Sequence, residues 1–320
     1  KGTEVTLEAN PNYYGGQPTF TKVIERKVPA GSNRVAAIKA GSADIAIELT
    51  PRDIADIRKN NASKTDVMSW YNNEILALGL NSKIAPWSLP KNQLIRQAVA
   101  YVLPVADIIK NDYLGDARAW YGLSQSNFYG YKAIKTYAEN DVAKAKALLA
   151  DAGYPNGFDM NMIYSPTRPG PEADQLAVLL KTQYAKIGVN VTFTRIASSA
   201  DFQAAFTAGK YQSMLYLEPP AIGDVFYSLN LYNTTASFQN TFSYNNADYD
   251  RLVGEIRVTP AGPAREARVS KVAEIIVDTV PVIYITDNIF LHAVRDRFDP
   301  KSFVYVPNGE LYAYTLVATK

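Results

Sequence analysis

Residues 159–217, DMNMIYSPTRPGPEADQLAVLLKTQYAKIGVNVTFTRIASSADFQAAFTAGKYQSMLYL, decide the fold class of this chain. Three short stretches in this segment are alternating or β-branched, and they predict strands at 159–164, 189–196 and 212–217. The stretches between them predict helices at 172–186 and 200–208. Strands that alternate with helices in this order form a mainly parallel sheet with right-handed crossovers, so we expect an α/β protein.

The same alternation extends toward the N-terminus. Short strands are expected at 5–8, 22–28 and 44–49, and helices at 34–39, 51–59 and 142–151. Asn140-Asp141 can cap the last of these helices, and Gly153 ends it in the left-handed region. A helical apolar stripe at 90–110 is interrupted by Pro104.

The C-terminal third predicts how the chain divides. Helices are expected at 246–257 and 264–278, and strands at 282–285, 293–297 and 311–317. We interpret the last strands as returning to the first part of the chain. The prediction is therefore two lobes joined by a hinge, with residues 1–87 and 288–320 in lobe I and 88–287 in lobe II.

Composition excludes several classes of function. Lys+Arg 33 and Asp+Glu 31 are interspersed, which argues against a nucleic-acid partner. The chain has no cysteine, which excludes disulfides, thiolate metal sites and cysteine nucleophiles. With one histidine besides, a metal site made only of protein ligands is disfavoured, and we expect no cofactor. No apolar stretch is long enough to cross a membrane.

Eight short patterns occur in an order that points to one protein family. They are NPNYY at 10–14, RVAAIKAGSADI at 34–45, LN at 80–81, IRQAVAY at 95–101, AKAKALLADAGY at 143–154, IGV at 187–189, YNN at 244–246 and PVI at 281–283. This succession resembles the peptide/nickel/opine-binding family of ABC-transporter extracellular solute-binding proteins. The resemblance implies a type II periplasmic binding protein fold with mixed or mainly parallel sheets.

The resemblance also implies a function and partners. A member of this family captures a small solute, here a peptide- or opine-like and carboxylated one, and delivers it to the permease subunits of an ABC importer. It works in the periplasm or at the cell surface, and no signal peptide is recognisable in this chain. Family members carry a long segment before the NPNYY pattern. We expect that segment to be missing from this piece or carried on a separate polypeptide.

Arg168 is the first candidate ligand contact. It follows a predicted strand and precedes a helix, where α/β sheets place ligands. The resemblance implies that an Arg-Pro at this point receives the ligand carboxylate, which a guanidinium binds with two parallel hydrogen bonds. The alternative is a surface arginine held by its neighbouring prolines.

A second candidate is the segment YLEPPAIGD at 216–224, which follows another parallel strand. Peptide binders of the family present here a Trp and then an Asp that pairs with the ligand's ammonium group. This sequence departs from that pattern, because Leu217 falls at the Trp position. Tyr216, Glu218 and Asp224 remain candidates, with Glu218 as a substitute anion. The alternatives are a rigid proline turn with a solvated Glu218, and Asp224 as the cap of a helix beginning at Val225.

Aromatic residues near the predicted hinge are the third candidate. Trp70, Tyr71 and Asn72 precede the strand that ends at Asn81, and they could line a cleft with stacking surface and amide donors. Trp120 and Tyr121 are weaker candidates of the same kind. The alternative for all of them is packing in the core or hinge.

Two other functions were weighed against solute capture. A glycoside hydrolase would need a pair of carboxylates, and no motif singles out a pair. Serine-type hydrolysis would need His292, which lies in an apolar strand where a structural role is more common. A carrier of an anionic metal chelate stays open within the binding class. We therefore expect a protein that is not an enzyme.

Overall fold

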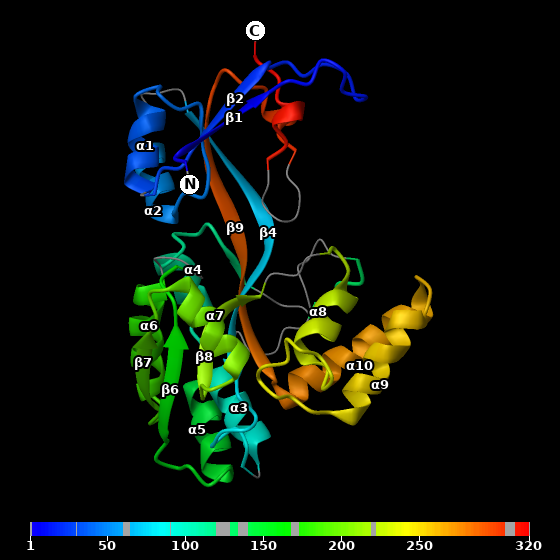
Figure 1. The fold of residues 1–320 in the computed structure, drawn as a ribbon. Helices are drawn as coiled ribbons and strands as arrows, with labels where there is room; N and C mark the ends of the chain where they lie inside the picture. Colours follow the sequence, from blue (N-terminus) through cyan, green and yellow to red (C-terminus); the bar gives the residue numbers. More distant parts are fainter. Residues whose placement is uncertain are drawn as a thin grey trace. The chain divides into compact units, whose positions relative to one another are not determined.

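The structure is a computed structural model, and it describes residues 2–29, 31–59, 65–89, 91–119, 129–133, 140–167, 173–218, 222–304 and 311–319. The chain divides into two compact units (Figure 1). Unit 1 comprises Lys1–Asn72 and Ile289–Lys320, and unit 2 comprises Asn73–Asn288. The chain therefore passes from one unit to the other within two long strands, β4 (Thr65–Leu80) and β9 (Val282–Arg295). Residues 73–87, expected in lobe I, belong to unit 2.

Among its described residues, unit 1 contains a two-stranded sheet, one end of the seven-stranded sheet and two α-helices. β1 (Glu4–Glu8) and β2 (Lys22–Arg26) form an antiparallel pair, and β3 (Ile45–Ala46) pairs with β9 at Val294 and Ala293. α1 (Gly31–Lys39) and α2 (Pro51–Lys59) pack against this second sheet. Their shared apolar core contains Val35, Ile38, Ile54, Ile57 and Leu291.

The strands of unit 2 confirm the predicted α/β sheet. β6 (Asp159–Tyr164) is parallel to β7 (Asn190–Arg195) on one side and to β8 (Ser213–Glu218) on the other. β8 then pairs antiparallel with β4, and β9 lies beyond β4. A two-residue strand, β5 (Arg118–Ala119), pairs with β9. The sheet is mixed, because β4 runs antiparallel to β8, whereas β6, β7 and β8 are parallel to one another.

Helices cover the sheet of unit 2 on both faces. Alternate residues of β4 point to opposite faces, so Leu76, Leu78 and Leu80 enter one core and Ile75 and Ala77 another. The first core is closed by α3 (Asn92–Tyr101), α4 (Val105–Asn111), α5 (Val142–Asp151) and α6 (Ala173–Ala185). The second is closed by α7 (Ser199–Ala208) through Phe202 and Phe206.

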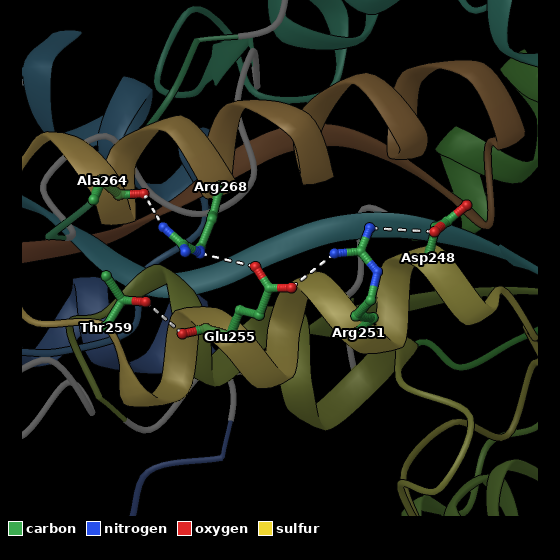
Figure 2. A network of polar contacts seen from close by, with 6 residues as sticks. All are labelled: Asp248, Arg251, Glu255, Thr259, Ala264 and Arg268. Carbon is green, nitrogen blue, oxygen red and sulfur yellow. Dashed lines mark hydrogen bonds and ion pairs between the residues drawn. The ribbon is translucent and has the colours of Figure 1, made fainter.

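Three further helices form a separate apolar cluster. α8 (Val225–Asn233), α9 (Ala247–Val258) and α10 (Pro263–Thr279) pack together, and Figure 1 shows α9 and α10 side by side. On their outer side Glu255 accepts hydrogen bonds from Arg251 Nη1 at 2.7 Å and Arg268 Nε at 2.9 Å (Figure 2). Exposed ion pairs of this kind stabilise a fold by less than about 1 kcal/mol each.

Local signals in the sequence set most helix ends. The Asp141 carboxylate accepts a hydrogen bond from Lys144 N at 2.9 Å, as expected for the N-cap of α5. Gly153 has φ +92° just beyond that helix, where only glycine is free of steric strain. In the described part of the chain no helix is long and apolar enough to cross a membrane.

Near the C-terminus one strand prediction was wrong, and two others fell within a single longer strand. The strands expected at 282–285 and 293–297 are parts of the single strand β9. The strand expected at 311–317 is instead a 3₁₀ turn, Ala313–Thr315. The amides of Thr315 and Leu316 bond to carbonyls three residues back, at Tyr312 and Ala313. Tyr312 N bonds to Val304 O and Val317 O accepts from Asp299 N, so the run makes isolated long-range bonds but no continuous ladder.

Candidate functional site

The carboxyl end of β8 carries the most unusual ionisable group in unit 2. All six residues of β8 are buried, because the strand lies between β4 and β6. Glu218 ends the strand opposite Ile75 of β4 and is 0% exposed. A carboxyl group is rarely buried to this extent without a positively charged partner.

The surroundings of Glu218 are polar but uncharged. The Tyr216 hydroxyl donates a hydrogen bond to Glu218 Oε2 at 3.4 Å. Burial raises the pKa of Glu218 to about 8, although the hydroxyls of Tyr284, Tyr216 and Ser228 act to lower it. The Glu218 carboxyl is therefore mostly protonated at neutral pH.

Helix α8 and strand β9 complete this polar cluster. We call Tyr216, Glu218, Ser228, Asn233 and Tyr284 the Glu218 cluster. Asn233 Nδ2 donates to the Tyr284 hydroxyl at 3.4 Å. Three buried oxygens of the cluster, Glu218 Oε1, Ser228 Oγ and Asn233 Oδ1, meet no hydrogen-bond partner among the described residues. The cluster thus has unused hydrogen-bonding capacity inside the protein.

Asp224 caps helix α8, which confirms the capping alternative. Its Oδ1 accepts a hydrogen bond from Phe226 N at 2.8 Å. Arg265 of α10 donates from Nη2 to both carboxylate oxygens, at 2.8 and 3.0 Å. The Arg265 guanidinium also lies over the Tyr129 ring, 5.3 Å from its centre. Tyr129 N bonds to Gly223 O at 2.9 Å, so Arg265 holds two separate loops together.

We expect Asp224→Asn to lower the free energy of unfolding by about 1–2 kcal/mol, because the amide can still cap α8 but loses the charge-assisted pairing to Arg265. Urea denaturation measures this difference. Asp248→Asn is the matched control, since Asp248 pairs with Arg251 in solvent and should cost less than about 0.5 kcal/mol. Equal effects of the two variants would contradict a role of Asp224 in joining the loops.

An ion pair on the β5–β9 ladder was missed by sequence reasoning. Arg118 Nε donates to Asp287 Oδ2 at 3.0 Å, and Arg118 Nη2 bonds to the same oxygen. Burial raises the pKa of Asp287, while Arg118 lowers it. The Arg118 side chain is 36% exposed, so it presents a fixed cation at the surface of unit 2. The available signal was Asp287 itself, the one acid in the apolar strand VIYITDNIF at 282–290.

The remaining sequence candidates are placed as follows. Tyr216 is 4% exposed, and its ring packs 5.2 Å from Phe242 and 6.2 Å from Phe206, centre to centre. Tyr216 and Glu218 therefore lie in the interior of unit 2, and their contact with a ligand stays a prediction. Trp70, Tyr71 and Asn72 belong to β4, but their side chains lie outside the description. Arg168, Trp120 and Tyr121 lie outside the described residues.

His292 occupies the structural position that its sequence context suggested. It is buried in unit 1, and its Nδ1 accepts a hydrogen bond from Glu48 N at 3.2 Å. Burial lowers its pKa to about 4, so the ring is neutral at physiological pH. Among the residues that the structure describes, no group of three or more His, Cys, Asp or Glu side chains could hold a metal ion.

Comparison with known proteins identifies relatives along the whole chain. Residues 1–240 match the model of bacterial extracellular solute-binding proteins, family 5 Middle. Heme-binding protein A of Haemophilus influenzae is 26% identical over 310 residues, which are 94% of this chain and 54% of that protein. The dipeptide-binding protein of Escherichia coli is 24% identical over 320 residues, covering 97% of this chain and 57% of that protein.

Solved structures agree with this chain in fold. HbpA2 from Haemophilus parasuis superposes with a TM-score of 0.84 at 24% identity, over 100% of this chain and 62% of that one. The ABC transporter substrate-binding protein CtaP from Listeria monocytogenes gives a TM-score of 0.86 at 21% identity, covering 100% of this chain and 64% of that one. The chain thus spans little more than half the length of the curated relatives described above.

Proposed function

The chain belongs to family 5 of the bacterial extracellular solute-binding proteins, and from this membership we propose that it captures a small solute for an ABC importer. It has the type II periplasmic binding protein fold of that family. The observation that carries the proposal is the family match over residues 1–240, which includes both β4 and β8. Capture needs a binding equilibrium only, so the proposed mechanism uses no nucleophile, acid or base.

The proposed ligand is a peptide- or opine-like solute that carries a carboxylate. Arg168 is the residue we propose for the carboxylate, because a guanidinium matches its two oxygens. Arg118 supports an anionic ligand as well, since Asp287 fixes its guanidinium on a strand and the side chain is 36% exposed. We further propose that Trp70, Tyr71 and Asn72 line the same ligand site.

The proposed partners and location follow from the same membership. The solute passes to the permease subunits of the importer in the cytoplasmic membrane. The protein acts in the periplasm or at the outer surface of the cell. The comparisons give no support to the glycoside hydrolase alternative.

Mass spectrometry of small molecules released by denaturing the purified protein tests this function. We expect one class of carboxylated solute, which rebinds the emptied protein with a saturable heat signal in calorimetry and is recovered unchanged. Chemical conversion of that solute, or of chromogenic glycosides, would contradict the proposal.

We expect Arg168→Ala to weaken binding of the carboxylated solute by about 1.5–3 kcal/mol, the contribution of a hydrogen bond to a charged group. Calorimetric titration of the emptied protein measures the loss. Arg195→Ala is the control, because Arg195 is already paired with Asp174 on the surface of unit 2. Unchanged affinity in the Arg168 variant would remove this arginine from the site.

A further inference from the structure

Among the described residues, polar side chains from β8, β9, α8 and α9 surround Glu218, and none of them carries a positive charge. The neighbours are Tyr216 on β8, Tyr284 on β9, Ser228 and Asn233 on α8, and Tyr249 on α9. The hydrogen of the Tyr249 hydroxyl is already used, since this hydroxyl donates to Leu229 O at 2.8 Å. The side-chain groups of the described residues that act on Glu218 by hydrogen bonding are thus hydroxyls, those of Tyr284, Tyr216 and Ser228.

The hydrogen-bond inventory of the cluster favours a carboxylic acid over a carboxylate. An ionised carboxylate can only accept hydrogen bonds, whereas the acid also has one hydrogen to donate. Ser228 Oγ and Asn233 Oδ1 are buried oxygens of α8 that meet no donor among the described residues. Glu218 Oε1 is buried and accepts no hydrogen bond from a described residue, so it is the atom at which a proton can be placed.

We propose that Glu218 is a proton-binding positioning residue: as a neutral acid it fastens the end of β8 to α8, and its ionisation loosens that attachment. The two elements are consecutive, since only six residues, 219–224, separate the end of β8 at Glu218 from the start of α8 at Val225. The residues that join them form the predicted ligand segment. The inference rests on the proposed function only in taking these joining residues as a ligand segment.

The proposal has a consequence for the kind of ligand. The segment 218–224 contains two carboxyl groups, those of Glu218 and Asp224. Glu218 is neutral and buried, and Asp224 is bound to Arg265 and to the α8 N-terminus. Neither offers a negative charge to an ammonium group. This segment therefore suits a ligand that is uncharged or anionic at the end it contacts.

Proton binding by Glu218 must appear in the pH dependence of stability. The carboxyl has an ordinary pKa of 4.5 in the unfolded chain and about 8 in the folded protein, so the folded state holds the proton more tightly. The contribution of Glu218 to stability is therefore fully present below pH 4.5 and is lost as pH rises from 4.5 to 8. In this window the unfolding equilibrium constant should rise by up to tenfold per pH unit through this group alone.

The test compares wild type with Glu218→Gln, which keeps the shape of the neutral acid, in ligand-free protein. Urea denaturation gives the unfolding equilibrium constant of each protein. We expect the constant of wild type divided by that of Glu218→Gln to rise with pH between 4.5 and 8 and to stay level above pH 8. His292 also titrates between 4 and 6.5, but it is present in both proteins and cancels in the ratio. A ratio that does not change with pH would overturn the proposal.

Two further measurements keep the proposal testable if the variant folds poorly. In wild type, ¹³C NMR should find one glutamate carboxyl that titrates between about pH 7 and 9, well above the ordinary range. If all glutamates titrate below about pH 6, the proposal is wrong. In wild type, the amide hydrogens of residues 225–233 should exchange faster than the same amides of Glu218→Gln above pH 8. At pH 6 the two proteins should exchange at the same rate. Because no ligand is involved, failure of these tests leaves solute capture untouched.

Discussion

Replacing Arg96 by alanine should lower the free energy of unfolding by about 3–5 kcal/mol, because the variant loses the hydrogen bonds that the buried guanidinium donates. Arg96 is buried on α3, and its Nη1 donates to Leu80 O at 3.5 Å and to Val280 O at 3.3 Å. Its Nη2 donates to Ser82 Oγ at 2.8 Å and to Trp87 O at 3.2 Å. The Arg96 side chain thus joins three parts of the chain: the end of β4, the end of α10, and the loop between β4 and α3.

The charge state of Arg96 strengthens this expectation. Burial lowers its pKa to about 10, so the guanidinium stays protonated at neutral pH. Val280 follows the last turn of α10, where the carbonyl end of the helix dipole favours a cation. Alanine would leave buried carbonyl oxygens without donors and a cavity where the side chain was.

Urea denaturation measures the effect of Arg96→Ala, with Arg251→Ala as the matched control. Arg251 is 57% exposed and makes two ion pairs along α9, so its loss should cost less than about 1 kcal/mol. Similar losses in both variants would show that the buried hydrogen bonds of Arg96 contribute no more than surface pairs.

Gly79→Ala is expected to destabilise unit 2 by about 3 kcal/mol through overpacking. Gly79 lies in β4 opposite Met214, and an added Cβ would fall 1.8 Å from Phe242 Cε1 and 2.1 Å from Cζ. Phe242 is fully buried and packs against Tyr216, Phe206 and Tyr211, so its ring has no open space to enter. In such a closely packed core, one added methyl group forces side chains or backbone out of their preferred positions.

A double-mutant cycle isolates the contact between Gly79 and Phe242. Phe242→Leu should itself destabilise unit 2, but Gly79→Ala should cost much less in that background, because the smaller side chain vacates the position of the new methyl group. Gly254→Ala is the control. Gly254 lies within α9 with open space around its Cβ position, so alanine there should stabilise the helix by up to about 1 kcal/mol. Additive effects at Gly79 and Phe242 would contradict the clash.

Elements with strong local signals were predicted to within one or two residues. β6 and α5 match their predicted bounds, because the alternation at 159–164 and the Asp141 cap with Gly153 act over a few residues only. The prediction failed at 311–317, where apolar β-prone residues bond to their own turn. A strand requires a partner strand, and no local pattern tells whether one is in reach.

In the segment 216–224 the local structure was predicted better than the state of the side chains. Sequence reasoning identified the strand end at 216–218 and the cap at Asp224, since strand ends and N-caps have local signatures. It took Glu218 as an anion for a ligand and overlooked Arg118. The structure places Glu218 in a buried neutral cluster and joins Arg118 to Asp287 from 169 positions away.

By itself the sequence determined the α/β class, the order of the elements and the resemblance to solute-binding proteins. These properties depend on periodicity, turns and caps within about 20 residues of each other. Only the tertiary structure decided that Glu218 is uncharged, that Asp224 is bound to Arg265 of α10, and that Arg96 joins four backbone and side-chain acceptors. The ionisation and partners of a side chain depend on water exclusion and on neighbours distant in sequence, which the folded chain alone brings together.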